Sequence, residues 1–163
     1  MDFSGTLYRS LNPLYARDPL SGEGAARFGG RFNPRGTPAL YTALSIGTAI
    51  REANQVGDLQ PTTLVAYRAT LINLFDCRDV ALLAAYDMTP EAIADPAWRE
   101  AMRTSGRAPT QELALALVSA GHPGLLARSF ARGAGPDDLN LVLWRWSGED
   151  AKFSLVDDEG RLA

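Results

Sequence analysis

Segments with the pattern of β-strands lie near both ends of this chain, and they enclose a middle that is mostly helical. Apolar runs and alternating residues predict strands at 5–9, 39–42, 63–70, 71–75, 124–127, 139–146 and 153–156. Helical spacing and capping residues predict helices over 45–56, 80–86 and 110–120, and two more that begin at Pro90 and Pro96. Because helices and strands do not alternate regularly, this order indicates an α+β domain with a curved, mostly antiparallel sheet.

Length and composition favour one folded domain over residues 1–163. No period of roughly 20–50 residues recurs, and no Ser/Gly-rich or single-charge linker divides the chain. No apolar run approaches the ~18 residues that a membrane span needs. The start, Met1-Asp2-Phe3-Ser4, lacks the basic and apolar regions of a secretory signal. The single cysteine, Cys77, excludes an internal disulfide framework and fits a cytoplasmic protein.

Several function classes are disfavoured by the charge and by the motifs that the chain lacks. The net charge of -3 argues against general nucleic-acid binding. Walker A, dinucleotide-type G-x-G-x-x-G and H-E-x-x-H motifs are missing, as is a cysteine–histidine cluster, so we expect no metal. We expect His122, in His-Pro-Gly after a helix, to be a turn residue and Cys77 to be a buried, inert thiol.

A glycine- and proline-rich segment, residues 12–38, separates the first two strands. A stretch of this length inside a compact domain is usually an ordered functional loop. It ends in Gly29-Gly30-Arg31-Phe32-Asn33-Pro34-Arg35-Gly36-Thr37-Pro38, which runs directly into Ala39-Leu40-Tyr41-Thr42. The paired glycines let the backbone approach a ligand closely or adopt a positive φ.

Three side chains around this loop each have a structural and a functional interpretation. Arg31 would either pair with a carboxylate to hold the loop or contact a pyrophosphate or ribose. Tyr41 would either belong to the core or stack on an aromatic base. Glu52 lies about 90° from the centre of the apolar face of its helix, at an edge where a carboxylate is partly shielded from water. That predicted face comprises Ile46, Ala49, Ile50, Ala53 and Val56.

Together these groups fit cleavage of an N-glycosidic bond. Departure of nicotinamide from NAD leaves an oxocarbenium-like ribose, and a carboxylate near the ribose hydroxyls stabilises the positive charge. Arginines would fix the pyrophosphate while an aromatic ring positions the leaving group. Such a reaction uses NAD as a cosubstrate and requires no metal. The alternative is a non-catalytic nucleotide- or partner-binding module, which would use the same residue types.

Several segments resemble one family in the same order along the chain. They are Tyr8-Arg9, Leu20-Ser21-Gly22-Glu23-Gly24-Ala25, Gly29-Gly30-Arg31-Phe32-Asn33, Ala39-Leu40-Tyr41-Thr42 and Glu52. The chain resembles the RES domain, named for its arginine, glutamate and serine, which is the toxin half of bacterial RES–Xre toxin–antitoxin pairs. The resemblance implies an ADP-ribosyltransferase-like fold, similar also to diphtheria-type toxins, with a split, curved sheet and surrounding helices. It also implies consumption of NAD by phosphorolysis, hydrolysis or ADP-ribosyl transfer to a protein.

The resemblance assigns roles to individual side chains. Arg9 and Arg31 correspond to the NAD-binding arginines of the family. Tyr41 corresponds to the ring that stacks near nicotinamide, and Glu52 to the catalytic carboxylate. The expected catalytic set is therefore Glu52, Arg31 and Tyr41. Ser129 matches the serine of the family, although Ala-Arg precedes it where many relatives have a proline.

Two further positions and a partner follow from the same resemblance. Gln111, at the start of the 110–120 helix, is expected to line the pocket, and Arg35 stands where lysine is frequent. A cognate Xre-type antitoxin would block the active site, and nucleic acid would be a ligand of the antitoxin alone. The acceptor of the ADP-ribosyl group is left open between a target protein, phosphate and water, because the residues that choose it lie on loops.

Overall fold

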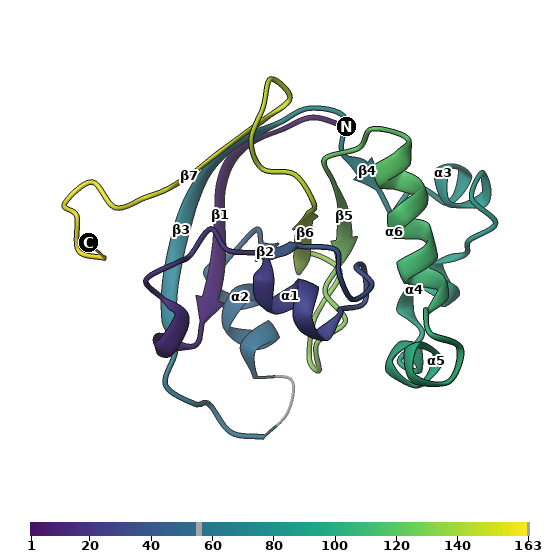
Figure 1. The fold of residues 1–163 in the computed structure, drawn as a ribbon, viewed down its shortest axis with the longest axis horizontal. Coiled ribbons are helices and arrows are strands. Elements are labelled where there is room, and N and C mark those ends of the chain that lie inside the picture. The colour runs from purple at the N-terminus through teal and green to yellow at the C-terminus, as the bar shows by residue number, and fades with distance from the viewer. Residues whose placement is uncertain (55–56, 163) are drawn as a thin grey trace.

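The computed structural model describes residues 1–54 and 57–162, and all of its strands belong to one open sheet (Figure 1). The strands are β1 (Phe3–Leu11), β2 (Leu40–Ala43), β3 (Thr63–Leu71), β4 (Phe75–Asp76), β5 (Gly124–Arg128), β6 (Leu139–Leu143) and β7 (Ala151–Leu155). Their order in the sheet is β4-β5-β6-β2-β1-β3-β7. Because β4 and β5 are parallel and every other pair is antiparallel, the predicted α+β class is confirmed.

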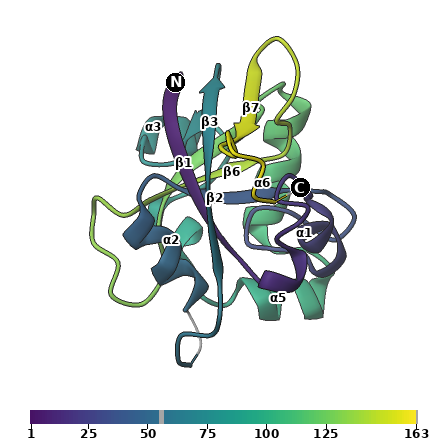
Figure 2. The same ribbon diagram turned by 90° about the vertical axis from the view of Figure 1, so that its left-hand side faces the viewer.

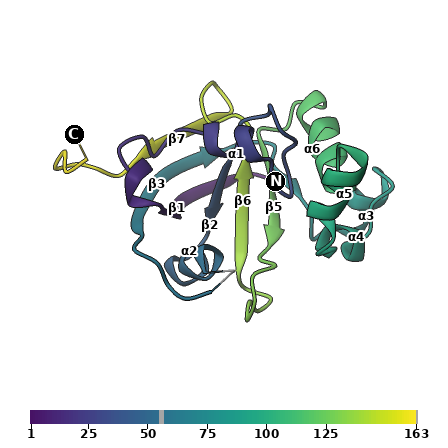
Figure 3. The same ribbon diagram turned by 60° about the horizontal axis from the view of Figure 1, so that its bottom comes forward.

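The helices are short and lie at two places around the sheet. They are the 3-10 helix η1 (Pro13–Tyr15) and the α-helices α1 (Glu23–Phe28), α2 (Ile46–Ala53), α3 (Val80–Ala84), α4 (Pro90–Ala94), α5 (Trp98–Ser105) and α6 (Pro109–Ser119). Helices α3 to α6 gather beside β4 and β5, as Figures 1 and 3 show. Helix α2 contacts β1 and β2 (Figure 2). Within the described ranges, no helix has the length and apolar character needed to cross a membrane.

The sheet consists of two halves that meet at a narrow junction. In one half, β1 pairs with β3 along its full length, from Phe3 opposite Leu71 to Leu11 opposite Thr63. In the other half, β2, β6, β5 and β4 follow one another. Between β1 and β2, the described residues form one paired position, Tyr8 with Ala43. This division agrees with the split sheet that the family resemblance implied.

The central strands of the second half are buried on both faces. Leu125 and Val142 pair across β5 and β6 and belong to the core beneath the helices. The next pair, Leu126 and Leu141, belongs to the core on the opposite face, with Leu7 of β1. Since successive side chains of a strand point to opposite faces, this double burial requires continuous apolar runs. This packing also fixes the positions of the ends of these strands, and those ends carry polar residues.

Several element boundaries differ from the prediction. Strand β3 continues to Leu71, and Asn73 turns the chain with a φ of 63°, so the predicted strand at 71–75 is reduced to β4. The long loop at 12–38 contains η1 and α1. Asp95 accepts a hydrogen bond from the amide of Ala97 at 2.8 Å, and α5 begins two residues after the predicted start at Pro96.

Helix starts were predicted best where a side chain caps the helix. Ser45 accepts a hydrogen bond from the amide of Thr48 at the start of α2. Asp79 and Thr89 cap α3 and α4 in the same way. Helix α2 ends at Ala53, and Val56, which the sequence placed in it, lies outside the described residues.

Cys77 follows β4 and is buried, as expected. Burial and the neighbouring Asp76 carboxylate raise the pKa of the Cys77 thiol to about 12. Because the thiolate is the reactive form, we expect alkylation by iodoacetamide at pH 8 to be on the order of a thousandfold slower in the folded than in the unfolded protein. Mass spectrometry with and without denaturant measures this ratio. Equal labelling rates in the two states would contradict the buried position.

Candidate active site

A cavity of about 380 Å³ lies where the two halves of the sheet diverge. Arg9 reaches it from β1, Tyr41 from β2 and Asn140 from β6, while Glu52 enters from α2. A smaller cavity of about 60 Å³ shares these four residues and reaches to the β1–β2 junction at Tyr8 and Ala43. The larger volume falls within the ~300–1,000 Å³ typical of small-molecule sites.

The Gly29–Gly30 turn owes its shape to a buried asparagine. Gly30 and Asn33 exchange backbone hydrogen bonds at 2.9 and 3.3 Å. The Asn33 side chain donates to the carbonyl oxygens of Ala25 at 2.8 Å and Thr37 at 2.9 Å. Because Asn33 is fully buried, its side chain uses these carbonyl oxygens as partners in place of water. The two bonds tie α1, which contains Ala25, to Thr37 at the end of the loop. The Gly29–Gly30 turn and the Asn33 side chain therefore form a rigid frame.

Tyr41 completes this frame from β2. Its hydroxyl donates to Asn33 Oδ1 at 2.6 Å and accepts from the amide of Phe32 at 3.0 Å. Burial raises the pKa of the Tyr41 hydroxyl well above its usual value, so the group remains a donor. The side chain lines the cavity as well. The Tyr41 hydroxyl thus belongs to the frame, while stacking of its ring on an aromatic base stays a prediction.

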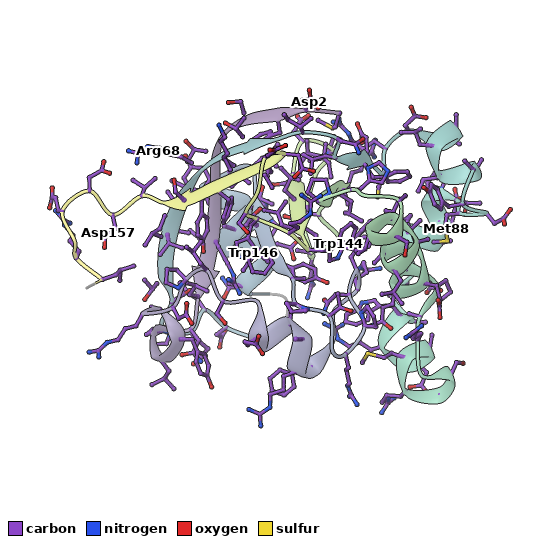
Figure 4. All side chains as sticks on the ribbon, turned by 45° about the horizontal axis from the view of Figure 1, so that its top comes forward. Asp2, Arg68, Met88, Trp144, Trp146 and Asp157 are labelled. Carbon is purple, nitrogen blue, oxygen red and sulfur yellow. The ribbon has the colours of Figure 1, made fainter. Side chains whose placement is uncertain are left out.

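Gln111 lies behind the loop. It is fully buried, and its amide donates to the carbonyl oxygens of Gly30 at 2.9 Å and Asn33 at 3.1 Å. It does not appear among the described residues that line the cavity, which differs from the expectation that it lines the pocket. The reason is that its side chain is occupied by backbone groups of the turn. Trp144, labelled in Figure 4, adds a bond from Nε1 to the Phe32 carbonyl at 2.8 Å.

Arg31 is held rigidly in the cavity wall. Its Nη1 donates to the carbonyl oxygens of Ile93 at 3.0 Å and Asp95 at 2.8 Å, at the end of α4. The guanidinium lies 4.5 Å from the ring centroid of Phe130. Burial, followed by the nearby charge of Arg99, lowers the pKa of Arg31, whereas the Glu52 carboxylate acts in the opposite direction. Arg31 remains charged at neutral pH because arginine starts from a very high pKa.

Glu52 accepts two hydrogen bonds on one carboxylate oxygen. Ser129 Oγ, just after β5, donates to Glu52 Oε1, and Asn140 Nδ2 on β6 donates to the same oxygen at 2.5 Å. Two donors on one oxygen fix the orientation of the carboxylate. The site therefore presents an anchored carboxylate beside arginines.

The orientation of α2 differs from the prediction. Part of the predicted apolar face points outward, because Ile46 and Ile50 are exposed by 47% and 36% and Ala53 is also exposed, whereas Ala49 is buried as predicted. Thr48 and Ala49 are the buried residues, and Glu52 lies one turn after Thr48 on the inward side. Polar contacts explain this orientation, because Thr48 Oγ1 donates to Asp138 Oδ1 at 2.6 Å.

Asp138 links the helix that carries Glu52 to the loop that carries Ser129. Its Oδ1 also accepts from Arg51 Nη1 at 2.6 Å, and its carbonyl oxygen accepts from the Ser129 amide at 2.7 Å. The bond from Thr48, with further donors that include Arg51, lowers the pKa of the Asp138 carboxyl. The two sides of the Glu52 site are thus joined by one ionised side chain.

The other two arginines that the sequence indicated, Arg9 and Arg35, lie in different places relative to the cavity. Arg9 lines both cavities, and its Nη1 donates to the Pro19 carbonyl at 3.5 Å. Arg35 is exposed and donates from Nε to the Phe28 carbonyl at 3.4 Å, outside the lining of the described cavity. No group of three or more His, Cys, Asp and Glu among residues 1–54 and 57–162 is placed to hold a metal ion.

Comparison with protein families assigns residues 6–163 to the RES domain. The chain belongs to the RES domain family. The resemblance carried by the Gly-Gly-Arg and Tyr-Thr segments is therefore confirmed. Over 99 residues this RES domain is 38% identical to proteins named NAD(+) phosphorylase MbcT from Mycobacterium bovis and Mycobacterium tuberculosis. The match covers 56% of this chain and 49% of MbcT, so the chain spans about half the length of the curated relatives it matches.

The fold of this RES domain is also found in a solved structure. It is similar to the crystal structure of the M. tuberculosis MbcT–MbcA toxin–antitoxin complex, with a TM-score of 0.68. The match covers 96% of this chain and 84% of that chain at 24% sequence identity. At this identity the likeness shows the fold alone.

The RES domain contains cavity residues that the sequence did not indicate. They are Trp98 and Arg99 of α5, Arg128 at the end of β5, Phe130 and Asn140. Arg128 and Phe130 flank Ser129, so the matched serine was a signal for that segment. Nothing in the local pattern around Trp98 or Asn140 pointed to a ligand site.

Replacing Ser129 by alanine removes one donor to Glu52. For the NAD cleavage proposed in the next subsection, we expect nicotinamide release to slow by roughly tenfold in the Ser129→Ala variant, the lower end of what a hydrogen bond to a charged group contributes. The rate constant kcat at saturating NAD is the measurement. Ser154→Ala, an exposed serine on β7, is the matched control and should keep the wild-type rate. A Ser129→Ala protein with wild-type kcat would show that the donor is dispensable.

Proposed function

We propose that this RES domain cleaves the bond between nicotinamide and ribose in NAD and transfers the ADP-ribosyl group to an acceptor. One observation carries this proposal. Glu52, fixed by Ser129 and Asn140, lines a cavity together with the arginines Arg9 and Arg31. A fixed carboxylate and fixed guanidinium groups suit a substrate that is positive at the reacting ribose and negative at its diphosphate.

The chemistry follows from charge. As the C1′–N bond breaks, nicotinamide leaves as a neutral base with the bonding electron pair, and positive charge develops on the ribose. Glu52 stabilises that charge and orients the ribose hydroxyls. Arg9 and Arg31 would bind the diphosphate, with Arg31 preorganised by the carbonyls of Ile93 and Asp95. Tyr41 would position the nicotinamide ring.

The name of the relative MbcT, NAD(+) phosphorylase, favours inorganic phosphate as the acceptor, which would yield ADP-ribose 1-phosphate and nicotinamide. Water would yield ADP-ribose, and a protein side chain would yield an ADP-ribosylated target, the outcome of an ADP-ribosyltransferase. All three share the same bond cleavage and differ in the nucleophile that reaches C1′.

The biological role that we propose is that of a cytoplasmic toxin held by a cognate antitoxin. The similarity to the toxin of the MbcT–MbcA complex supports an antitoxin partner. We propose an Xre-type antitoxin that covers the cavity, because occupying the space between Arg31 and Glu52 would exclude NAD. Co-purification with such an antitoxin should suppress nicotinamide release.

Nicotinamide release from pure protein tests the enzymatic proposal. The protein is incubated with NAD alone, with NAD and phosphate, and with NAD and cell extract, and the products are separated by chromatography and mass spectrometry. Nicotinamide in any arm supports the proposal, and its partner product identifies the acceptor. NAD binding without nicotinamide in all three arms would instead establish the non-catalytic binding module.

A further inference from the structure

The cavity contains more positive charge than its carboxylate balances. Glu52 is the single acidic residue among the described residues that line it. Four arginines line it as well: Arg9, Arg31, Arg99 and Arg128. Elsewhere in the described structure, seven arginines form ion pairs with acidic side chains: Arg51, Arg68, Arg78, Arg103, Arg107, Arg145 and Arg161. None of the four cavity arginines is among these pairs. Unpaired guanidinium groups that converge on a cavity indicate an anion site.

Two of these arginines exceed what the dinucleotide needs. The diphosphate of NAD carries two negative charges, and Arg9 and Arg31 complement them in the proposed function. Arg99 and Arg128 are a second pair. Arg99 stacks on the Trp98 ring at 4.4 Å, and its charge lowers the pKa of Arg31, which places the two cations near each other. Such a like-charge arrangement is relieved when an anion binds between the cations.

Arg128 lines the same cavity from the end of a strand. It ends β5, immediately before Ser129, whose hydroxyl donates to Glu52. Two residues later, Phe130 stacks on Arg31. Arg128 also lines a neighbouring cavity of about 420 Å³ beside α4, which it shares with Phe130. Arg99 and Arg128 are both exposed, so they lie at the solvent side of the site.

We propose that Arg99 and Arg128 form a second anion subsite, which binds inorganic phosphate as the acceptor of the ADP-ribosyl group. This inference rests on the proposed cleavage of NAD and names the residues that select its acceptor. Guanidinium groups bind phosphate through two parallel N–H donors, and their position at the open side lets phosphate enter after the dinucleotide.

The reaction at this subsite is balanced. A phosphate oxygen donates an electron pair to form the bond to C1′ of the ribose, and the C1′–N bond breaks with its electrons leaving on nicotinamide. The products are nicotinamide and ADP-ribose 1-phosphate, and no oxidant, reductant or further reactant is consumed. Arg99 and Arg128 hold the nucleophile and take no part in proton transfer. Without phosphate, water reaches C1′ and the product is ADP-ribose.

Steady-state kinetics with phosphate as the varied substrate tests the subsite. We expect Arg99→Gln and Arg128→Gln each to raise the KM for phosphate by about tenfold, and the double variant by more, because each loses a charge-assisted contact. The KM for NAD and the slow hydrolysis without phosphate should stay within about twofold of wild type, since these depend on Arg9, Arg31 and Glu52. Arg132→Gln changes an exposed arginine on the neighbouring loop that forms no ion pair among the described residues, and it is the matched control.

The outcomes separate this inference from the proposed function. A wild-type protein that releases no nicotinamide would refute NAD cleavage itself. The subsite alone would be refuted if the rate of nicotinamide release did not depend on the phosphate concentration. It would also be refuted if that rate depended on phosphate equally in the wild type and the double variant. A raised KM for NAD with an unchanged KM for phosphate would assign both arginines to the dinucleotide and also refute it. Thermal melting of each variant excludes unfolding as the cause.

Discussion

Nicotinamide release by the Glu52→Gln variant is expected to fall by about 10²- to 10³-fold. Glutamine keeps the shape of the side chain and one oxygen that can accept from Ser129 and Asn140. What it loses is the negative charge, and that charge acts on the ribose when the glycosidic bond is breaking. The loss should therefore appear in kcat, while NAD affinity measured by calorimetry changes little.

The matched control for this change is Glu149→Gln, which removes the charge of an exposed glutamate outside the cavity lining. It should retain wild-type turnover. If Glu52→Gln also retains wild-type turnover, Glu52 is not the catalytic carboxylate and the proposed mechanism fails. If both kcat and thermal stability collapse, Glu52→Asp separates the two effects, since it restores the charge on a shorter side chain.

Replacing Gly30 by alanine is expected to destabilise the protein by roughly 3 kcal/mol and to abolish most activity. A Cβ atom at this position would lie 2.4 Å from the Tyr41 hydroxyl and 2.6 Å from Asn33 Oδ1. These two atoms share a hydrogen bond within the frame of the turn, so one of them must move. Urea denaturation measures the loss of stability, and nicotinamide release measures the displacement of Arg31.

Gly47→Ala in α2 is the matched control, because no described atom beyond its chain neighbours and the backbone of its own helix lies within 4 Å of the added Cβ. It should stabilise the protein by about 0.5–1 kcal/mol, as expected for alanine in place of glycine in a helix. A Gly30→Ala protein with wild-type stability would show that the turn relaxes easily. The frame around Asn33 would then not be the reason for a glycine at residue 30.

The sequence predicted the fold best where local chemistry decides it. Caps at Ser45, Asp79 and Thr89 marked helix starts, and alternation or apolar runs marked the long strands. The Gly-Gly-Arg segment and its following strand identified the family because a close turn needs glycine. These signals lie within a few residues of the feature that they predict.

The orientation of α2 could not be read from its own sequence. Its apolar residues suggested that Ile46 and Ile50 face the core, yet Thr48 and Glu52 face inward. The deciding contact is with Asp138, which lies 90 residues from Thr48 along the chain. Polar contacts at the candidate site override the hydrophobic pattern here.

The same limitation applies to the rest of the site. Asn140 sits in β6 between apolar neighbours, and only its register opposite Ala43 brings it to Glu52. Trp98 and Arg99 arrive on α5, whose position depends on packing against α6. The family resemblance suggested Gln111 as a pocket residue. Its buried bonds to Gly30 and Asn33 became apparent only with the fold.

The polar residues that line the candidate active site are scattered along the chain, from Arg9 to Asn140. Ribosomes add about 5–20 residues per second, so on the order of ten seconds separate the synthesis of these two residues. During that interval Glu52 has no Asn140 to hold it, and β2 lacks its neighbour β6. For the toxin role proposed above, the nascent chain would stay inactive until translation is far advanced. A partner protein therefore has that interval in which to become available and bind the emerging chain.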